Sequence, residues 1–416
     1  MKTSKTSPPR EPQTLTRSHY HRGVTGSNLG RTKDVNRRVV LEAIRTYGPL
    51  ERAEIVTRTN LAVQTVSNIV NDLIDEGLIQ KGPAKPGRLG PPARPLEIRP
   101  DGAYSIGLSL DQRSVLGCIT NLGGRTLASE EVPITGLSGP DAERLICALI
   151  GRLQSAPGDV SSPIMGVGMA VSGPFGVQSY LMDGPTSAPS WLSNAVIDNI
   201  SRKIGLPIEL ANDSTASTIG QRIYGIAKDA GSFAHFFVGY GAAVGYFLDD
   251  RIYSGADGNA GEIGHTMLMP GGHSCFCGNQ GCLEQYLSLY SARHQLGADV
   301  FSETGLMQFC ESIRDPDRKT QIWLNDAAEA FRRAVHMIEQ MVDPDRIIVG
   351  GYMPRPVLTA ILHAAEPLYP SIRQRGGSGD PRVILGETGR SAGMVSAAAL
   401  PLYSNMNPSL DIVLRK

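Results

Sequence analysis

The stretch GHTMLMPGGHSCFCGNQGCLEQ, residues 264–285, places three of the chain's six cysteines within eight positions. Closely spaced cysteine thiolates with a nearby histidine are the usual ligands of a structural zinc site, which takes four tetrahedral ligands. Cys275, Cys277 and Cys282 supply three of them, and either His265 or His273 can supply the fourth. With all four positions filled by protein, no place is left for an activated water. We therefore expect Zn²⁺ in a structural role.

The composition bounds the size and the compartment. The chain has 416 residues, 41% of them hydrophobic, which is enough for one large domain or two to three ordinary ones. No apolar run approaches the roughly 18 residues of a membrane helix, and residues 1–30 lack the apolar core of a signal peptide. We expect a cytoplasmic protein with no membrane partner, and we interpret residues 1–30 as a flexible arm.

Charge is unevenly distributed along the chain. Residues 1–100 contain 17 basic and 9 acidic side chains, whereas the rest of the chain contains 23 and 31. A basic first quarter joined to an acidic remainder favours an anionic partner for the N-terminal part. The alternative is a surface that is uneven by chance.

The first hundred residues carry the pattern of a helix-turn-helix. Residues 34–47 are amphipathic and end at Gly48-Pro49. A short helix over 52–58, a tight turn at Asn60 and a second helix follow. The second helix has an apolar stripe at i, i+3, i+4 and i+7, formed by Val66, Ile69, Val70 and Leu73.

The opposite face of this second helix is polar and uncharged, which suits base edges and phosphates in a major groove about 12 Å wide. Residues 80–98 then have the pattern of a wing, in which Lys85 and Arg88 can meet phosphates or the minor groove. A solvated surface is the alternative for a lone polar helix, but the full series favours operator DNA as the partner. The candidate DNA-binding residues of the helix are Gln64, Thr65, Ser67, Asn68 and Asn71.

Two segments resemble a known family. GPLERAEIVTRTNLAVQTVSNIVNDLIDEGLI (48–79) resembles the winged-helix end of repressors in the ROK family (repressors, open reading frames and sugar kinases), such as xylose- and N-acetylglucosamine-type repressors. Residues 264–284 match that family's signature, GH followed by CxCGxxGCxE, at every fixed position. The resemblance covers about residues 34–400, and its pattern points to His265 as the fourth metal ligand. Where the family usually has Gly and Ser in the recognition turn, this chain has Asn60 and Ala62.

The resemblance also implies a sugar site. Its residues are Asn212, Asp213, Glu262, His265 and Glu284, whose counterparts in the family contact sugar hydroxyls. Zinc would orient His265 and hold Glu262 and Glu284 together at the opening of the sugar site. Asn212 and Asp213 also fit as a cap of the helix that follows, and both roles can hold at once. The loop 166–176 resembles a strand and Gly-Pro loop beside the sugar, and Ser187 replaces an asparagine usual in the kinases.

The family's phosphate loops are altered in this chain. The kinases carry Asp-x-Gly-Gly-Thr where this sequence has Ser109 and then Asp111, Gln112 and Arg113. Without those glycines the backbone cannot come close to a phosphate. The second loop, GYGAAVG at 239–245, has Tyr240 where the family has threonine and Ala243 where it has glycine. We expect no enzymatic activity, although Asp111 leaves a shifted role open.

We expect an α/β protein with an N-terminal winged helix-turn-helix, followed by the two-lobed actin/hexokinase-like (ribonuclease H-like) sugar-binding domain that the resemblance implies. The divisions are an arm (1–30), a DNA-binding domain (31–100), a first lobe (101–223) and a second lobe (224–416) whose last helix, about 391–403, returns to the first. The hypothesis is a sugar-responsive transcriptional regulator, most simply a repressor, acting as a homodimer or homotetramer. The alternatives are an ATP-dependent sugar kinase with an accessory DNA-binding head and a regulator controlled by a protein partner.

Overall fold

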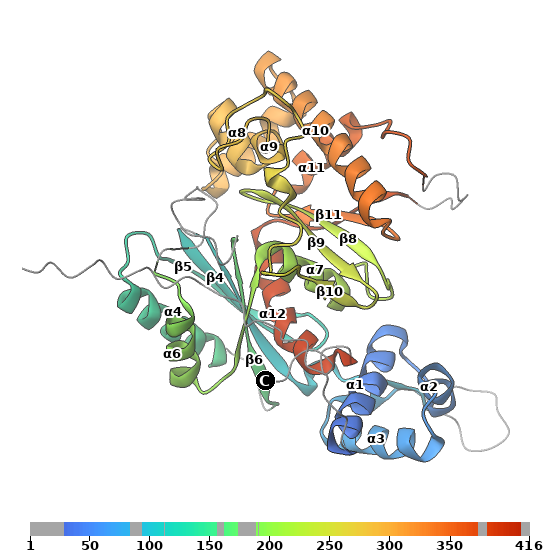
Figure 1. Ribbon diagram of the computed structural model, residues 1–416. Coiled ribbons are helices and arrows are strands. Elements are labelled where there is room, and N and C mark those ends of the chain that lie inside the picture. Colours follow the sequence, from blue (N-terminus) through green and yellow to red (C-terminus); the bar gives the residue numbers. More distant parts are fainter. Residues whose placement is uncertain are drawn as a thin grey trace, which may run out of the picture.

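The computed structural model describes residues 29–83, 94–111, 113–155, 162–173, 189, 191–372 and 381–408 (Figure 1). It confirms the expected α/β class, with a small N-terminal head followed by two five-stranded sheets. Within these residues, no helix is both long and apolar enough to cross a membrane. Residues 1–28, most of the predicted arm, lie outside the described ranges.

The head consists of three helices and a two-stranded sheet. Its elements are α1 (Leu29–Tyr47), α2 (Arg52–Thr59), α3 (Val63–Asp75), β1 (Ile79–Lys81) and β2 (Leu96–Ile98), with β1 and β2 antiparallel. The first helix begins five residues before the predicted start. The apolar stripe of α3 is buried against Val40, Leu41 and Ile44 of α1. Asn60 has the expected left-handed conformation (φ 55°), and Ala62 caps α3 without a side-chain hydrogen bond.

The two large sheets share one topology, with three antiparallel strands followed by two parallel ones. The first has the order β5 (Thr126–Pro133), β4 (Ser114–Asn121), β3 (Tyr104–Leu110), β6 (Ile164–Val171), β7 (Ile208–Asn212). The second has the order β10 (Arg251–Tyr253), β9 (Ala242–Leu248), β8 (Phe233–Val238), β11 (Ile347–Gly351), β12 (Val383–Thr388). The buried parallel strands IMGVGMAV and IIVGG are continuous apolar runs, as such strands require.

Helices cover the outer face of each sheet and fill the space between the sheets. The first sheet packs against α4 (Gly139–Gln154) and α6 (Asn194–Ile204). The second packs against α8 (Leu289–Leu296), α9 (Glu303–Arg314), α10 (Arg318–Val342) and α11 (Arg355–Ala364). Between the sheets lie α7 (Asp213–Ile223) and α12 (Arg390–Met406), which pack closely on each other (Figure 1). The described residues also include the 3₁₀ turns η1 (Pro100–Gly102), η2 (Ile263–His265) and η3 (Leu283–Gln285).

The last helix lies directly on the backbone of the first sheet. A Cβ atom on Gly107 of β3 would lie 2.0 Å from the Met394 oxygen, and one on Gly168 of β6 would lie 1.8 Å from the Ala397 oxygen. Any side chain at either glycine would therefore push α12 away. The Ser105 hydroxyl adds a hydrogen bond of 2.6 Å to the Ala398 oxygen.

Gly168→Ala should separate α12 from the sheet and lower the free energy of unfolding by about 1–3 kcal/mol, the usual range for overpacking a close contact. Urea denaturation measures the change. Gly151→Ala, in α4, is the matched control because a Cβ there meets no atom within 4 Å. In the control, the gain in helix propensity should stabilise the chain by about 0.5–1 kcal/mol. Equal effects of the two variants would show that α12 does not depend on this contact.

Candidate functional site

The side chains of His265, Cys275, Cys277 and Cys282 form one cluster, in which the four candidate ligand atoms lie within 4.8 Å of one another. The Sγ atoms of Cys277 and Cys282 are 3.6 Å apart, and Cys275 Sγ lies 3.6 Å from His265 Nδ1. Tetrahedral bonds of about 2.3 Å to sulfur and 2.0–2.1 Å to nitrogen give ligand separations of about 3.5–3.8 Å. The cluster therefore has the donor set and the dimensions that fit a metal ion of zinc's size.

Two glycines let the cysteine loop turn around this cluster. Gly278 (φ 92°) and Gly281 (φ 79°) have left-handed backbones, and a Cβ on Gly281 would lie 1.8 Å from the Met269 oxygen. The other histidine of the segment is used elsewhere. The His273 ring packs against Tyr286, with 5.0 Å between ring centroids, and its backbone N–H donates to the Tyr286 hydroxyl. His265 is therefore the histidine of the cluster.

Three carboxylates meet beside the cluster, and they come from different parts of the chain. Asp213 begins α7 directly after β7, Glu262 precedes η2, and Glu284 lies in η3, two residues after Cys282. A Cβ on Gly173 would lie 3.2 Å from Glu262 Oε1 and 3.6 Å from the Asn212 Cβ. The turn after β6 in the first sheet thus touches the glutamate contributed by the second.

Burial raises the pKa of each of the three carboxyls. The pKa of Asp213 rises to about 6, although the Ser214 N–H and the Ser172 hydroxyl donate to it. The pKa of Glu262 rises to about 7, by burial and then by the charge of Asp213. The pKa of Glu284 rises to about 8; its Oε2 accepts the Ala242 N–H at 3.3 Å, and its buried Oε1 has no partner in the described structure. Enclosed carboxylates short of donors match a ligand with many hydroxyl groups.

Asn212 has the capping role that the sequence suggested as one of two readings. Its Oδ1 accepts the Thr215 N–H at 2.8 Å and the Ser214 hydroxyl at 3.2 Å, so it caps α7. One residue of the site was not singled out from the sequence. Ser172 donates to Asp213 Oδ2 at 3.2 Å, and the only sequence signal for it is the loop 166–176 in which it stands.

The region that corresponds to the kinase phosphate loops is filled by tyrosines. Ser109, at the end of β3, hydrogen-bonds the buried Tyr352 hydroxyl at 2.8 Å. The Tyr240 ring stacks on Phe301 with 5.4 Å between centroids and meets Tyr352 edge-on. These contacts join residues that follow β8 and β11 to Ser109 of β3 and to Phe301. Gln112 and Ser187 lie outside the described residues.

The Asp111 carboxylate is also engaged. Its Oδ1 accepts the N–H groups of Arg113 and Ser114 at 2.7 and 2.8 Å, and its Oδ2 accepts from Arg390 at 3.3 Å. Arg390 also bonds Glu131 at 2.8 Å. The carboxylate therefore already has three donors, and the arginine is balanced by two acids.

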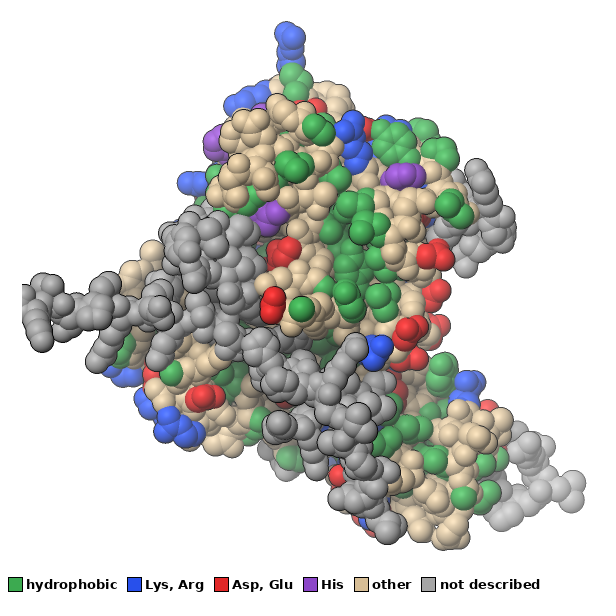
Figure 2. All heavy atoms as spheres, viewed as in Figure 1, with side chains coloured by type: hydrophobic (Ala, Val, Ile, Leu, Met, Phe, Trp, Pro, Cys, Tyr) green, Lys and Arg blue, Asp and Glu red, His purple; other side chains and the backbone are tan. Residues whose placement is uncertain are grey.

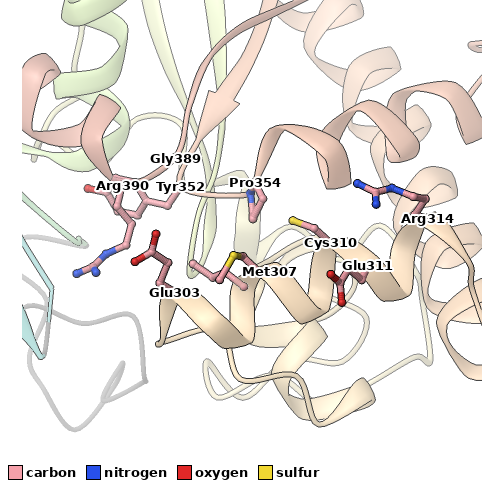
Figure 3. Close-up of a pocket in the computed structure, with 10 residues that line it drawn as sticks. Glu303, Met307, Cys310, Glu311, Arg314, Tyr352, Pro354, Gly389 and Arg390 are labelled. Atoms are coloured by element: carbon pink, nitrogen blue, oxygen red, sulfur yellow. The ribbon is translucent and has the colours of Figure 1, made fainter.

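An open groove of about 380 Å³ is lined by Tyr352 and by residues of the second lobe (Figure 3). One wall is α9, with Glu303, Met307 and Cys310, and the other is formed by Pro354 and the Gly389–Arg390 turn. The groove is mixed in character, because Glu303 and Glu311 line it together with Arg314 and Arg390.

The structure places the predicted DNA-contacting residues of the head on α3. Gln64, Asn68 and Asn71 are exposed, while Thr65 and Ser67 are half-buried at the flanks. Gln64 Nε2 donates to Asn68 Oδ1 at 2.9 Å, and Asn71 accepts from Arg52 of α2 at 2.7 Å, a residue that the sequence analysis did not select. Lys85 and Arg88 of the predicted wing lie outside the described residues.

The fold and the site define a class: a two-lobed α/β protein of the sugar-kinase type with a winged helix-turn-helix head. A sequence model of the ROK family matches residues 106–403, so the chain belongs to the ROK family and the resemblance noted in the sequence is confirmed. It is 27% identical to the xylose repressor of Bacillus spizizenii over 62% of this chain and 66% of that protein. The chain thus spans slightly less than two thirds of that relative.

Two solved structures share the fold. The first is a ROK family transcriptional regulator described as a homolog of the E. coli MLC protein, with a TM-score of 0.69 and 21% identity, over 92% of this chain and 99% of that one. The second is a ROK hexokinase from Thermus thermophilus, with a TM-score of 0.54 and 21% identity, over 71% and 97%. The match to the regulator thus covers a larger share of this chain than the match to the hexokinase.

Asp213→Asn should stabilise the chain more at high pH than at low pH. Because the folded state keeps this proton up to a pKa of about 6, against an ordinary 3.8, stability is lost as pH rises between those values. The stabilisation by the variant should be about 1 kcal/mol larger at pH 8 than at pH 5, measured by urea denaturation.

Asp317→Asn, at the cap of α10, is the control for this pH effect. Hydrogen bonds from Thr320 lower the pKa of Asp317, so that carboxylate is ionised in the folded and unfolded states at both pH values. The effect of the control should therefore not change between pH 5 and pH 8. An Asp213 variant that is equally affected at both pH values would mean that the native carboxylate is already ionised at pH 5.

Proposed function

We propose that this protein is a sugar-responsive transcriptional regulator, most simply a repressor, which binds operator DNA through its head and a sugar or sugar derivative between its lobes. The observation that carries the proposal is the enclosed set of Asp213, Glu262 and Glu284, built in one chain with a winged helix-turn-helix. The name of the relative from B. spizizenii, a xylose repressor, supports it. The head corresponds to residues 31–100, the first lobe to 101–223 and the second to 224–416.

The cysteine cluster would hold Zn²⁺ in a structural role. Zinc suits three thiolates and an imidazole, and it leaves no open coordination position. By fixing His265 and the loop that ends at Cys282, it would hold Glu262 and Glu284 beside Asp213. Asn212 and His265 would complete the set of sugar contacts. Reduced thiols at such a site are typical of the cytoplasm, where we place the protein.

The filled phosphate region supports a regulator without enzymatic activity. Phosphoryl transfer needs a carboxylate for the metal and backbone loops close to the phosphates. Here Ser109 and Tyr352 bond to each other where those loops converge, and Asp111 is held by three donors. The shared fold keeps a sugar kinase as the alternative, and robust ATP turnover with any sugar would favour it.

Operator recognition would use two heads of a homodimer or of a dimer within a tetramer. A palindromic site read by two recognition helices requires two-fold symmetry. In the view of Figure 2, hydrophobic side chains gather over the sheet of the second lobe. An apolar surface of this kind is typical of contacts between proteins. The polar face of α3 would read the bases, with Lys85 and Arg88 of the wing on phosphates or in the minor groove.

Binding of the full chain to DNA from upstream of its own gene, at two salt concentrations and with a panel of sugars and sugar phosphates, tests the proposal. We expect salt-sensitive binding that one member of the panel weakens. Glu262→Gln should remove the response to that sugar and leave DNA binding intact. Asn68→Ala should weaken DNA binding by about 10-fold, the usual cost of one base contact.

Asn68→Ala also removes the hydrogen bond between Gln64 and Asn68 within α3. Asn325→Ala is the control for this loss, because Gln321 and Asn325 form a hydrogen bond of the same length, 2.9 Å, on α10, away from the head. This control should bind DNA as the unmodified chain does. Failure of the unmodified chain to bind DNA, together with sugar phosphorylation, would replace the regulator by a kinase.

The purified chain should contain one zinc ion, measured by elemental analysis. Cys277→Ser should lower the zinc content well below one per chain and weaken sugar binding, since the loop carrying Glu284 loses its anchor. Cys147→Ser, a half-buried cysteine of α4 outside the cluster, should change neither quantity. Full sugar affinity in the metal-free chain would show that the loop holds its shape without the ion.

A further inference from the structure

The head is attached to the two helices between the lobes rather than to the outside of either lobe (Figure 1). Val40, Leu41 and Ile44 of α1 belong to the same apolar cluster as Ile223 of α7 and Tyr403 of α12. Arg38 of α1 donates to the oxygen of Asn407, which follows α12 directly. The C-terminal ends of both inner helices therefore meet the head.

Arg45 of α1 makes the most specific of these contacts. Its Nη1 donates to the carbonyl oxygens of Arg222 and Ile223 at 3.2 and 3.1 Å, in the last turn of α7. Terminal carbonyls of a helix lack partners within it, and its negative dipole end favours a cation. Arg45 thus supplies both donors and charge to the end of α7.

Glu42 holds this arginine in place. Its two oxygens accept from Arg45 Nε and Nη2, both at 2.7 Å, and Oε1 also accepts from Arg222 at 2.7 Å. Arg45 and Arg222 are each only 8% exposed, and Glu42 is 20% exposed. One carboxylate therefore links an arginine of the head to an arginine of α7 in a nearly closed setting. We call Glu42, Arg45 and Arg222 the clamp.

The other end of the same helix is the sugar site. Asn212 caps α7 and Asp213 is its first residue, whereas Arg222 and Ile223 are its last two. Eleven residues at 1.5 Å each make a helix about 16 Å long, without an interruption. It is packed along its length: a Cβ on Gly220 would lie 2.3 Å from Ser396 Oγ of α12, and Thr218 fills the space over Gly245 of β9. Such a helix moves as a unit.

We propose that α7 transmits the state of the sugar site to the DNA-binding head, with Glu42 and Arg45 as the positioning residues that couple the head to it. The inference rests on the proposed function and assigns the regulation of that site. A ligand that bonds Asn212 and Asp213 displaces the start of α7 when the lobes close on it. The clamp carries that displacement to α1, and so changes the placement of α3 in each head of the dimer.

Linkage fixes how this coupling is observed. If the sugar lowers operator affinity by some factor, the operator lowers sugar affinity by the same factor, commonly 5- to 150-fold in allosteric proteins. We call this ratio of affinities the coupling factor. Substitution of a residue that serves folding alone does not change the coupling factor. Substitution of a residue that couples the two sites changes the coupling factor and leaves the affinity for sugar alone and for DNA alone near their original values.

The test measures the factor in the full chain with Arg45→Gln and with Glu42→Gln. The DNA probe is the upstream DNA, and the ligand is the member of the panel that shifts DNA binding of the unmodified chain. We expect the factor to fall toward one in both variants, while sugar affinity without DNA and DNA affinity without sugar stay within about threefold. Glu42→Gln is nearly isosteric and covers the case in which Arg45→Gln does not fold.

Arg152→Gln is the matched control. Arg152 and Glu130 form the same two-bond pair, at 2.8 and 2.9 Å, between α4 and β5, away from α7. It should keep the full factor.

Any of three results would overturn the inference. The first is a coupling factor that stays unchanged in both clamp variants, and the second is a coupling factor that Arg152→Gln lowers as much as the clamp variants do. The third is a loss of DNA binding by the folded clamp variants in the absence of sugar. The last of these would make the clamp a fixed support of the head. If no member of the panel changes DNA binding by the unmodified chain, the proposed function and this inference fail together.

Discussion

The contact of α12 with the backbone of β3 and β6 is the constraint on which most of the molecule depends. Gly107 and Gly168 let the helix lie on the first sheet at a distance that no side chain would allow. The other side of α12 packs against α7, which in turn packs on β8 and β9 of the second sheet. The two lobes are therefore joined through a helix pair, and the head rests on the far ends of that pair. Asn212 and Asp213 of the proposed sugar site lie at one end of α7, and the head lies at the other.

The proposed sugar site lowers the stability of the fold that holds it. Burial raises the pKa of Asp213, Glu262 and Glu284, which means that their ionised forms are disfavoured in the empty protein. Without a further constraint, the three carboxylates would move apart, and the unfavourable burial of their ionised forms would be relieved. The metal cluster would prevent that movement, because His265 is three residues from Glu262 and Cys282 is two residues from Glu284. A sugar that donated hydrogen bonds to all three would relieve this cost, and the relief would contribute to its differential free energy of binding.

Local signals predicted the elements that local chemistry determines. The stripe of Val66, Ile69, Val70 and Leu73 predicted α3, the spacing of Cys275, Cys277 and Cys282 predicted the cluster, and the family was recognised from fixed motif positions. The start of α1 was predicted five residues too late, because the prediction was based on Val40, Leu41 and Ile44, which lie in the second half of the helix. The clamp could not be predicted, since Glu42 and Arg222 are 180 residues apart and an arginine at a helix end has many possible partners. The role of Tyr352 could not be predicted either, because it depends on a hydrogen bond to Ser109, which lies on β3 of the first lobe.

The tyrosines in the phosphate region bear on how a kinase-type fold can serve as a sensor. Here Tyr352 joins the end of β11 to Ser109 on β3, and Arg390 joins the start of α12 to Asp111 and Glu131. These contacts join the two lobes in the region where the kinases of the family have their phosphate loops. A sugar bound as we propose would then act on the lobes from the other side, and that one ligand would determine the position of α7 and of the head attached to it.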